Sequence, residues 1–162
     1  MTVDDRVDVD DPDVVADVAA AFAGYEAALV DDAKARIVGY FWDSDRTVRF
    51  GVADRQAGAD QVRQWRAVQP PLPPGRRLFD TRITTFGPDH AVVTTCFAYP
   101  DRPAVGRQSQ TWVRFPTGWR IVNAHVSELP EPPDLPAVLD RPIEDVSASD
   151  YVIPPYLASG RA

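Results

Sequence analysis

The sequence has few of the residues that build metal and redox sites. Its 162 residues include one cysteine, Cys96, and two histidines, His90 and His125. A single cysteine cannot form an internal disulfide and fits a reducing compartment, so Cys96 is predicted to be a small, buried strand residue. Two scattered histidines and one cysteine do not make a metal cluster. We therefore expect no metal and no other cofactor.

Positive charge and long apolar runs are also scarce. The chain has 17 Lys and Arg against 24 Asp and Glu, a formal net charge of -7. This balance argues against nucleic acid, whose binding depends on neutralising phosphates with Lys and Arg. No apolar run approaches the roughly 20 residues that span a bilayer, and no secretory leader is recognisable. The sequence predicts a cytoplasmic protein that binds neither nucleic acid nor membrane.

Helix patterns come first in the chain and strand patterns follow. Asp11, Pro12 and Asp13 are typical of a helix start, with Asp11 as the N-cap. The predicted helices are 13–30, a second one around 37–42 and 60–69; the predicted strands are 47–52, 77–86, 91–99, 107–115 and 119–126. This order indicates an α+β fold, with helices packed on one face of a curved antiparallel sheet. A ligand cavity is expected between the helices and the concave face.

Three regions differ in composition. Residues 1–12 are acidic and predicted to be a disordered leader. Residues 13–128 form the folded domain. Residues 129–162 are rich in proline, which prevents regular structure, and are expected to form an extended arm lying on the domain or on a partner.

The last two predicted strands suggest a dimer. Their apolar and polar residues do not alternate cleanly, which is typical of a sheet covered on both faces. The helices cover one face. We expect a second copy to cover the convex face, over Thr111, Val113, Ile121 and Asn123.

Four motifs carry a family resemblance: FWDSDRTVRFG, AGADQVRQWR, TRITTFG and GRQSQTWVR. With the segment GWRIVNAHVS, they make residues 14–127 resemble the nuclear transport factor 2-like superfamily, a cone-shaped α+β fold. Within it they look like the AtzH-like branch, which includes HpxZ-like proteins. The resemblance implies a small, dimeric, cofactor-free enzyme or accessory protein associated with amidases of ureido-compound breakdown. Its best understood member type decarboxylates 1,3-dicarboxyurea to allophanate.

The resemblance also implies two catalytic residues, because Tyr25 and Arg49 match the Tyr and Arg assigned to that active site. Arg49 lies in a short apolar strand, so its guanidinium needs a carboxylate or a ligand anion. The alternatives are an ion pair with Asp43 or Asp45, or an exposed sheet edge.

Tyr25 lies on the apolar stripe of the first helix, facing the expected cavity. A nearby Arg would favour the phenolate and bring proton exchange closer to neutral pH. The alternative is an ordinary core tyrosine whose hydroxyl bonds to the backbone.

Five further residues are candidates for substrate binding. Trp65 and Arg66 lie on the third helix, which borders the cavity mouth in this fold; Trp65 could equally be core, and Arg66 could be a second anion clamp or a solvated charge. Gln110 shares a strand face with Trp112 and is expected to hydrogen-bond a urea-like amide. Phe97 is expected on the inner face of its strand.

Two other residues have no assigned chemistry. Strand parity groups His125 with Trp119, Ile121 and Asn123, opposite to Val122, Ala124 and Val126. The resemblance implies that the second group faces the cavity, so His125 is predicted to be a structural residue on the outer sheet face. The sequence does not determine which face of the sheet carries Arg82.

Three functions fit these features. The first is a decarboxylase in which Arg49 holds one carboxylate and Tyr25 protonates the nitrogen as carbon dioxide leaves. The second is a non-catalytic binding or assembly module, possible because a fold does not determine function. A closed pocket with Arg49 paired internally favours this reading, whereas an open pocket with Arg49 unpaired favours catalysis. The third, a ketosteroid-isomerase-like proton shuttle, needs an inward Asp or Glu that the strands do not offer.

Overall fold

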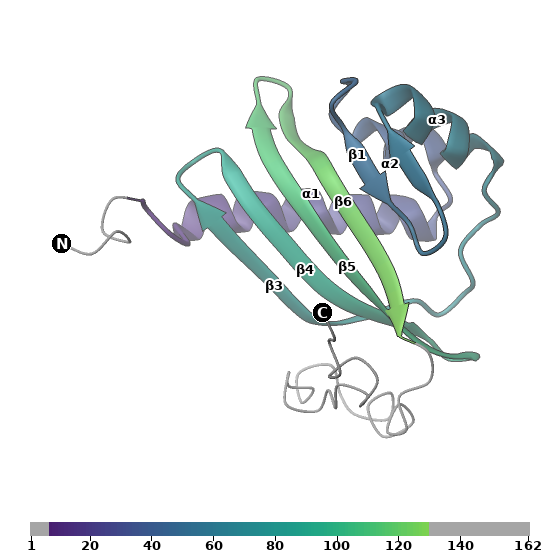
Figure 1. The fold of residues 1–162 in the computed structure, drawn as a ribbon. Coiled ribbons are helices and arrows are strands. Elements are labelled where there is room, and N and C mark those ends of the chain that lie inside the picture. Colours follow the sequence, from purple (N-terminus) through teal and green to yellow (C-terminus); the bar gives the residue numbers. More distant parts are fainter. Residues whose placement is uncertain (1–6, 130–162) are drawn as a thin grey trace, which may run out of the picture.

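The computed structural model describes residues 7–129, and the proline-rich arm after Leu129 lies outside them. Figure 1 shows the elements in order: α1 (Pro12–Val30), α2 (Lys34–Gly39), β1 (Val48–Phe50), β2 (Arg55–Ala57), α3 (Ala59–Val68), β3 (Arg77–Phe86), β4 (His90–Tyr99), β5 (Arg102–Phe115) and β6 (Gly118–Leu129). The strands form one sheet in the order β2-β1-β6-β5-β4-β3. The predicted α+β class is confirmed.

The sheet differs from the expectation in three details. It is mixed, because β1 runs parallel to β6 while every other neighbouring pair is antiparallel. No strand was predicted between residues 52 and 60, where the structure has β2 paired with β1. No strand was predicted between residues 99 and 107, but β5 begins at Arg102, and Tyr99 pairs with Arg102.

Helix α1 begins as the sequence indicates. The Asp11 carboxylate accepts hydrogen bonds from the backbone nitrogens of Asp13 and Val14, at 2.9 and 3.2 Å. These bonds satisfy two of the amides that a helix start leaves without partners. A disordered leader was predicted for residues 1–12, of which residues 1–6 lie outside the described part. Within the described part, Val9 forms a bridge with Phe86 at the end of β3.

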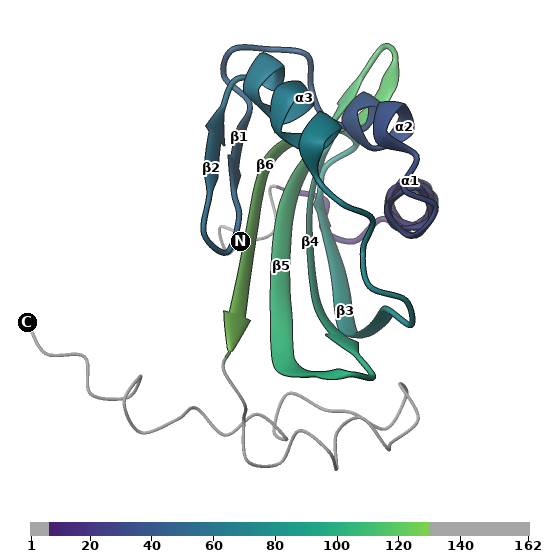
Figure 2. The same ribbon diagram turned by 90° about the vertical axis from the view of Figure 1, so that its right-hand side faces the viewer.

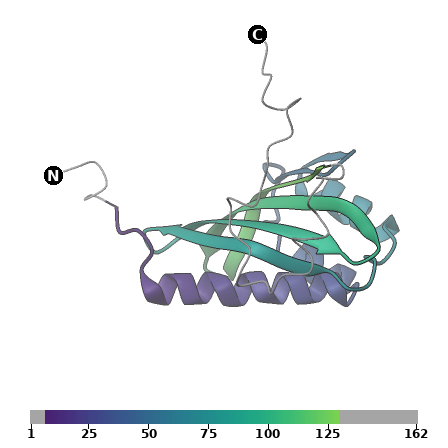
Figure 3. The same ribbon diagram turned by 90° about the horizontal axis from the view of Figure 1, so that it is seen from below.

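The helices lie on one face of the sheet, and α1 runs along that face (Figures 2 and 3). Its buried stripe includes Val18, Phe22, Tyr25 and Leu29, as predicted. This stripe packs in one core with sheet residues such as Val93 and Trp112, which are 1% and 0% exposed. Burial of each large apolar side chain stabilises the fold by about 1.5–3 kcal/mol.

A β-bulge in β6 changes which side chains face the core. Thr111 pairs with Asn123 and Trp112 with Ile121, so Val122 is an extra residue in β6. A bulge reverses the alternation on one side of itself. The predicted grouping by parity is therefore wrong for Trp119 and Ile121, which are buried.

The outer-face prediction for His125 is confirmed. His125 and Asn123 follow the bulge and are exposed. The His125 ring makes an edge contact with Phe50, at 5.6 Å between centroids. Arg82 is also exposed and lies within 3.4 Å of Asp80.

Among the described residues, no helix is both long enough and apolar enough to cross a membrane.

Candidate active site

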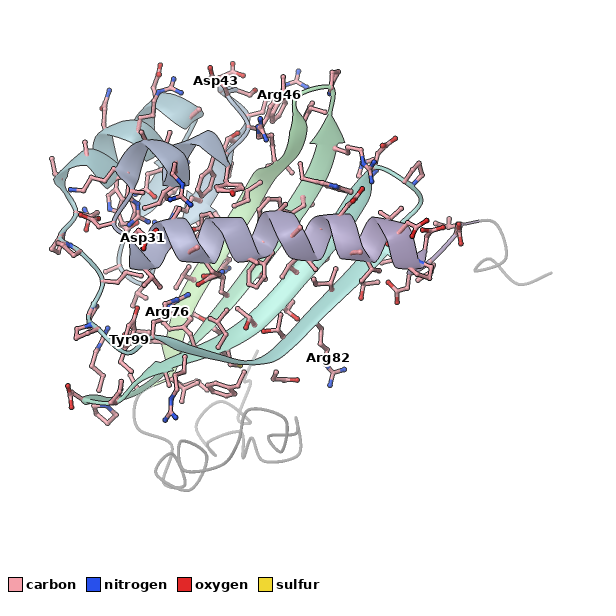
Figure 4. The ribbon with its side chains drawn as sticks, turned by 180° about the vertical axis from the view of Figure 1, so that it is seen from behind. Asp31, Asp43, Arg46, Arg76, Arg82 and Tyr99 are labelled. Atoms are coloured by element: carbon pink, nitrogen blue, oxygen red, sulfur yellow. The ribbon has the colours of Figure 1, made fainter. Side chains whose placement is uncertain are left out.

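A cavity of about 270 Å³ lies between the sheet and the helices, as the fold predicted. Its wall comes from α1, β1, α3, the 69–73 loop, β4, β5 and β6. Six predicted site residues line it: Tyr25, Arg49, Trp65, Arg66, Phe97 and Gln110. Figure 4 shows two further wall residues, Arg76 and Tyr99, close together near the C-terminal part of α1. Trp112, the seventh predicted residue, does not line the cavity.

Arg49 is paired within the protein. Its Nη1 donates to Asp54 Oδ1 at 2.7 Å and to Gln56 Oε1 at 2.8 Å. Its guanidinium carbon lies 3.8 Å from the centre of the Trp65 ring, within cation–π distance. The partner is Asp54, at the end of the turn after β1, and neither Asp43 nor Asp45.

Arg66 is buried and has no ion pair with another described residue. It is 7% exposed, and its guanidinium carbon lies 4.6 Å from the centre of the Trp65 ring. Within residues 7–129 its side chain has no carboxylate partner and no hydrogen bond. Burial lowers the pKa of Arg66, while the negative charges of Asp32 and Asp54 act in the opposite direction. An arginine still keeps its charge at neutral pH, so Arg66 supplies a cation suited to a ligand anion.

Gln110 presents an unused donor. The side chain is 2% exposed, and its Oε1 accepts a hydrogen bond from Trp112 Nε1 at 3.1 Å. This bond sets the orientation of the amide, because an indole nitrogen can only donate. Gln110 Nε2 then has no partner among the described residues. Trp112 lies in the core, where it orients Gln110.

The hydroxyl of Tyr25 has no hydrogen-bond partner within residues 7–129. The ring is 4% exposed and makes edge contacts with Tyr40, Phe41 and Trp112. The part of the chain that the structure describes offers its hydroxyl no hydrogen bond. The backbone-bonded tyrosine considered from the sequence is therefore not observed.

The pKa of Tyr25 is raised, which corrects the expectation of a stabilised phenolate. Burial is the largest cause, and the neighbouring Glu26 carboxylate raises the pKa further. Arg66, Arg49 and Arg76 lower it but do not compensate. Tyr25 is consequently a neutral phenol at pH 7, able to donate a proton or a hydrogen bond.

A buried ion pair beside the cavity was not predicted. Arg76 Nε donates to Glu26 Oε2 at 2.9 Å, and the same guanidinium donates to Tyr99 and Gln108, both at 3.3 Å. Burial alone would lower the pKa of Arg76, but the charge and hydrogen bonds of Glu26, with Tyr99, raise it overall. The position of Glu26 beside Tyr25 on α1 was the only sequence signal.

Phe97 is placed in the wall by a glycine across the strand pair. Phe97 pairs with Gly106, and a Cβ on Gly106 would lie 2.0 Å from the Phe97 ring. Only glycine allows this ring to lie over the neighbouring strand. Arg76 covers the ring, with its guanidinium carbon 4.0 Å from the centroid.

The described residues contain no cluster of His, Cys, Asp and Glu that could hold a metal ion.

The helices, the curved sheet and the cavity between them form the fold of solved structures described as nuclear transport factor 2-like, such as one from Pseudomonas putida that is 14% identical, with a TM-score of 0.57 and coverage of 70% and 84%. The family model described as AtzH-like matches residues 7–132, so the chain belongs to the AtzH-like family. No curated protein matches the chain.

Solved structures agree with this assignment. A cystatin-like fold protein from Burkholderia xenovorans is 45% identical, with a TM-score of 0.75, and the match covers 78% of this chain and 99% of that one. A protein of unknown function from Pectobacterium atrosepticum is 43% identical, with a TM-score of 0.74 and coverage of 80% and 98%. A ketosteroid isomerase-like protein from Erwinia carotovora atroseptica is 14% identical, with a TM-score of 0.59 and coverage of 73% and 98%, and shows the fold alone.

Proposed function

We propose that the protein is a cofactor-free enzyme that decarboxylates a small N-carboxylated urea, of the 1,3-dicarboxyurea type. The observation that carries the proposal is a buried, unpaired Arg66 in the same cavity as the neutral phenol of Tyr25. The family resemblance supplies the reaction type.

The charges around the cavity favour one anionic group in the ligand. Three wall arginines have carboxylate partners: Arg49 with Asp54, Arg76 with Glu26, and Arg102 with Glu128 at 3.0 Å. Arg66 is the wall arginine that has no carboxylate partner among residues 7–129. A carboxylate of the substrate would pair with Arg66 and accept a hydrogen bond from Gln110 Nε2. This assigns to Arg66 the anchoring role that the sequence suggested for Arg49.

The reaction requires one proton donor. When the bond between nitrogen and the second carboxylate breaks, carbon dioxide leaves and the electron pair stays on the nitrogen. Tyr25 donates its proton to that nitrogen as general acid. The resulting phenolate is stabilised by the positive charge of Arg66 and recovers its proton from water.

The apolar part of the wall supports loss of the second carboxylate. Leu29, Leu72 and Phe97 line the cavity and offer a carboxylate no hydrogen bonds. Transfer of a charged group from water to such surroundings is unfavourable, whereas carbon dioxide is neutral. The wall therefore favours the products over the bound carboxylate.

A second candidate is an accessory module that partners an amidase. Internal pairing of Arg49 with Asp54 is the condition that favoured this reading, while the partly open cavity favours catalysis. A proton shuttle like that of ketosteroid isomerase has an inward carboxylate in Glu26, on α1, but Arg76 and Gln108 already engage it. We rank the shuttle last.

The test is carbon dioxide release from 1,3-dicarboxyurea and related ureido acids, generated in the assay because carboxylated ureas are labile. We expect release well above the spontaneous rate with the pure protein. The Val30→Ala variant, altered at an exposed position at the end of α1, should match the wild type. A rate equal to buffer would reject the enzyme and favour the accessory module.

A further inference from the structure

One carboxylate oxygen of Asp54 is hydrogen-bonded, and the other has no partner among the described residues. Its Oδ1 accepts hydrogen bonds from Arg49 Nη1 at 2.7 Å and Gln56 Nε2 at 2.9 Å. Its Oδ2 accepts none from the described residues. The Asp54 side chain lines the cavity and is 35% exposed. A carboxylate oxygen can accept two hydrogen bonds, so Oδ2 retains its full capacity.

The carboxylate of Asp54 is held firmly. Arg49 and Gln56, which hold it, are buried, at 7% and 4% exposed. The backbone nitrogen of Gly51 donates to the Asp54 carbonyl at 2.8 Å, which closes the turn between β1 and β2. The carboxylate packs against Gly51, where an added Cβ would lie 2.5 Å from Oδ1 and 2.6 Å from Oδ2. A group fixed in this way is suited to recognition.

We propose that Asp54 is a specificity residue that accepts an N–H from the bound ligand, and that Arg49 is a positioning residue acting through Asp54. The inference rests on the proposed function, because it concerns the same cavity.

The other polar groups in the cavity explain why an acceptor is informative. The Arg66 guanidinium and Gln110 Nε2 are donors, and the Tyr25 phenol is available as one. They suit the carboxylate and carbonyl oxygens of a ligand. Asp54 Oδ2 repels a carboxylate and binds an N–H. A ligand with a carboxylate at one end and urea N–H groups further along can bind both the donors and the Asp54 acceptor. A dicarboxylate without N–H groups would instead place a negative charge against the negative charge of Asp54.

Two probes separate this role from a purely structural ion pair. Ureidoacetate and levulinate have the same length, one carboxylate and one carbonyl, but levulinate has carbon in place of both nitrogens. Hydrogen bonds to charged groups contribute about 1.5–3 kcal/mol, so wild-type protein should bind ureidoacetate roughly tenfold or more tightly in calorimetric titration.

The decisive variant is Asp54→Asn. Its Oδ1 can still accept from Arg49 and Gln56, but Nδ2 replaces the unused acceptor with a donor. We expect the preference for ureidoacetate to disappear while the protein stays folded, with a lower melting temperature because the buried Arg49 loses the charge of its partner. The matched control Arg66→Met removes the carboxylate anchor and should weaken both probes by the same factor.

Two results would overturn the role of Asp54: a preference that persists in Asp54→Asn, or wild-type protein that does not distinguish the probes. Wild-type protein that binds neither probe at millimolar concentration would also overturn it. A protein with an Asp54-dependent preference but no carbon dioxide release would retain the Asp54 proposal and reject the decarboxylase.

Discussion

Tyr25 is the residue whose two roles are most easily separated. Tyr25→Phe keeps the ring and its edge contacts and removes a hydroxyl that makes no hydrogen bond within the described residues. We expect kcat to fall by roughly 10²–10⁴, the loss typical of a general acid. The melting temperature should change little. Normal turnover with a clear loss of stability would identify Tyr25 as structural.

The raised pKa of Tyr25 predicts the alkaline limb of the pH profile. The ordinary phenol value is 10.0, and burial moves the pKa of Tyr25 above it. Because the protonated form is the donor, activity that depends on Tyr25 should persist up to about pH 10. The measurement is kcat from pH 7 to 10, corrected for spontaneous decarboxylation. A fall in kcat near pH 8 that is absent from Tyr25→Phe would contradict this prediction.

Arg66 should lower stability while it promotes binding. An unpaired buried cation costs free energy, so Arg66→Met should leave the free energy of unfolding unchanged or increased. Loss of a charge-assisted hydrogen bond should raise KM roughly 10–100-fold. Urea denaturation and steady-state kinetics on the same variant check both effects. A destabilised variant with normal KM would mean that Arg66 has a structural partner.

At the scale of elements, the buried pair of Glu26 and Arg76 joins α1 to the segment before β3. The two side chains are 10% and 5% exposed. Glu26→Ala should cost about 3–5 kcal/mol, because it leaves a buried arginine unpaired. The matched control is Asp17→Ala, which breaks the exposed α1 pair with Arg114 and should cost at most about 1 kcal/mol. If urea denaturation shows that both variants lose the same free energy of unfolding, burial does not determine the cost of breaking an ion pair.

The sequence predicted the main elements better than the direction of individual side chains. Periodicity and the Asp11 cap located α1 and its buried stripe, because these signals are local. The bulge at Val122 has no local signal, and it reversed the predicted facing of Trp119 and Ile121. Short strands such as β2 are set by pairing with β1, so the pattern of their own residues did not indicate them.

The sequence predicted most residues of the candidate site, but it did not predict which ion pairs they form. Six predicted residues line the cavity, since their strand or helix faces could be inferred. Arg49 pairs with Asp54 across the turn after β1, whereas Arg76 pairs with Glu26 from a distant part of the chain. The pairing of Arg76 depends on tertiary packing, and the turn that brings Asp54 to Arg49 was not predicted, so the sequence could not show that Arg66 would be the cavity-wall arginine without a carboxylate partner among the described residues.

At the scale of the whole molecule, we propose a homodimer formed through the outer sheet face. Phe50 and Val92 are exposed on it, at 39% and 36%, and Thr111 and Val113 are partly buried. Ile121 is no longer part of this surface, because the bulge turns it inward. Light scattering at micromolar concentration should give twice the mass of one chain, and Val92→Arg should shift the mass toward one chain. A single-chain mass for the wild type would reject the dimer.

The parallel pairing of β1 with β6 determines when the candidate site can form during synthesis. Val48 pairs with Asn123, so the two partners are separated by 75 positions (123 minus 48). Contacts this distant in sequence form late, because a long loop must close first. Ala124 and Val126 of β6 also contribute to the cavity wall. On the ribosome, Tyr25, Arg49 and Arg66 are therefore made early but have no enclosed site until β6 has emerged and docked.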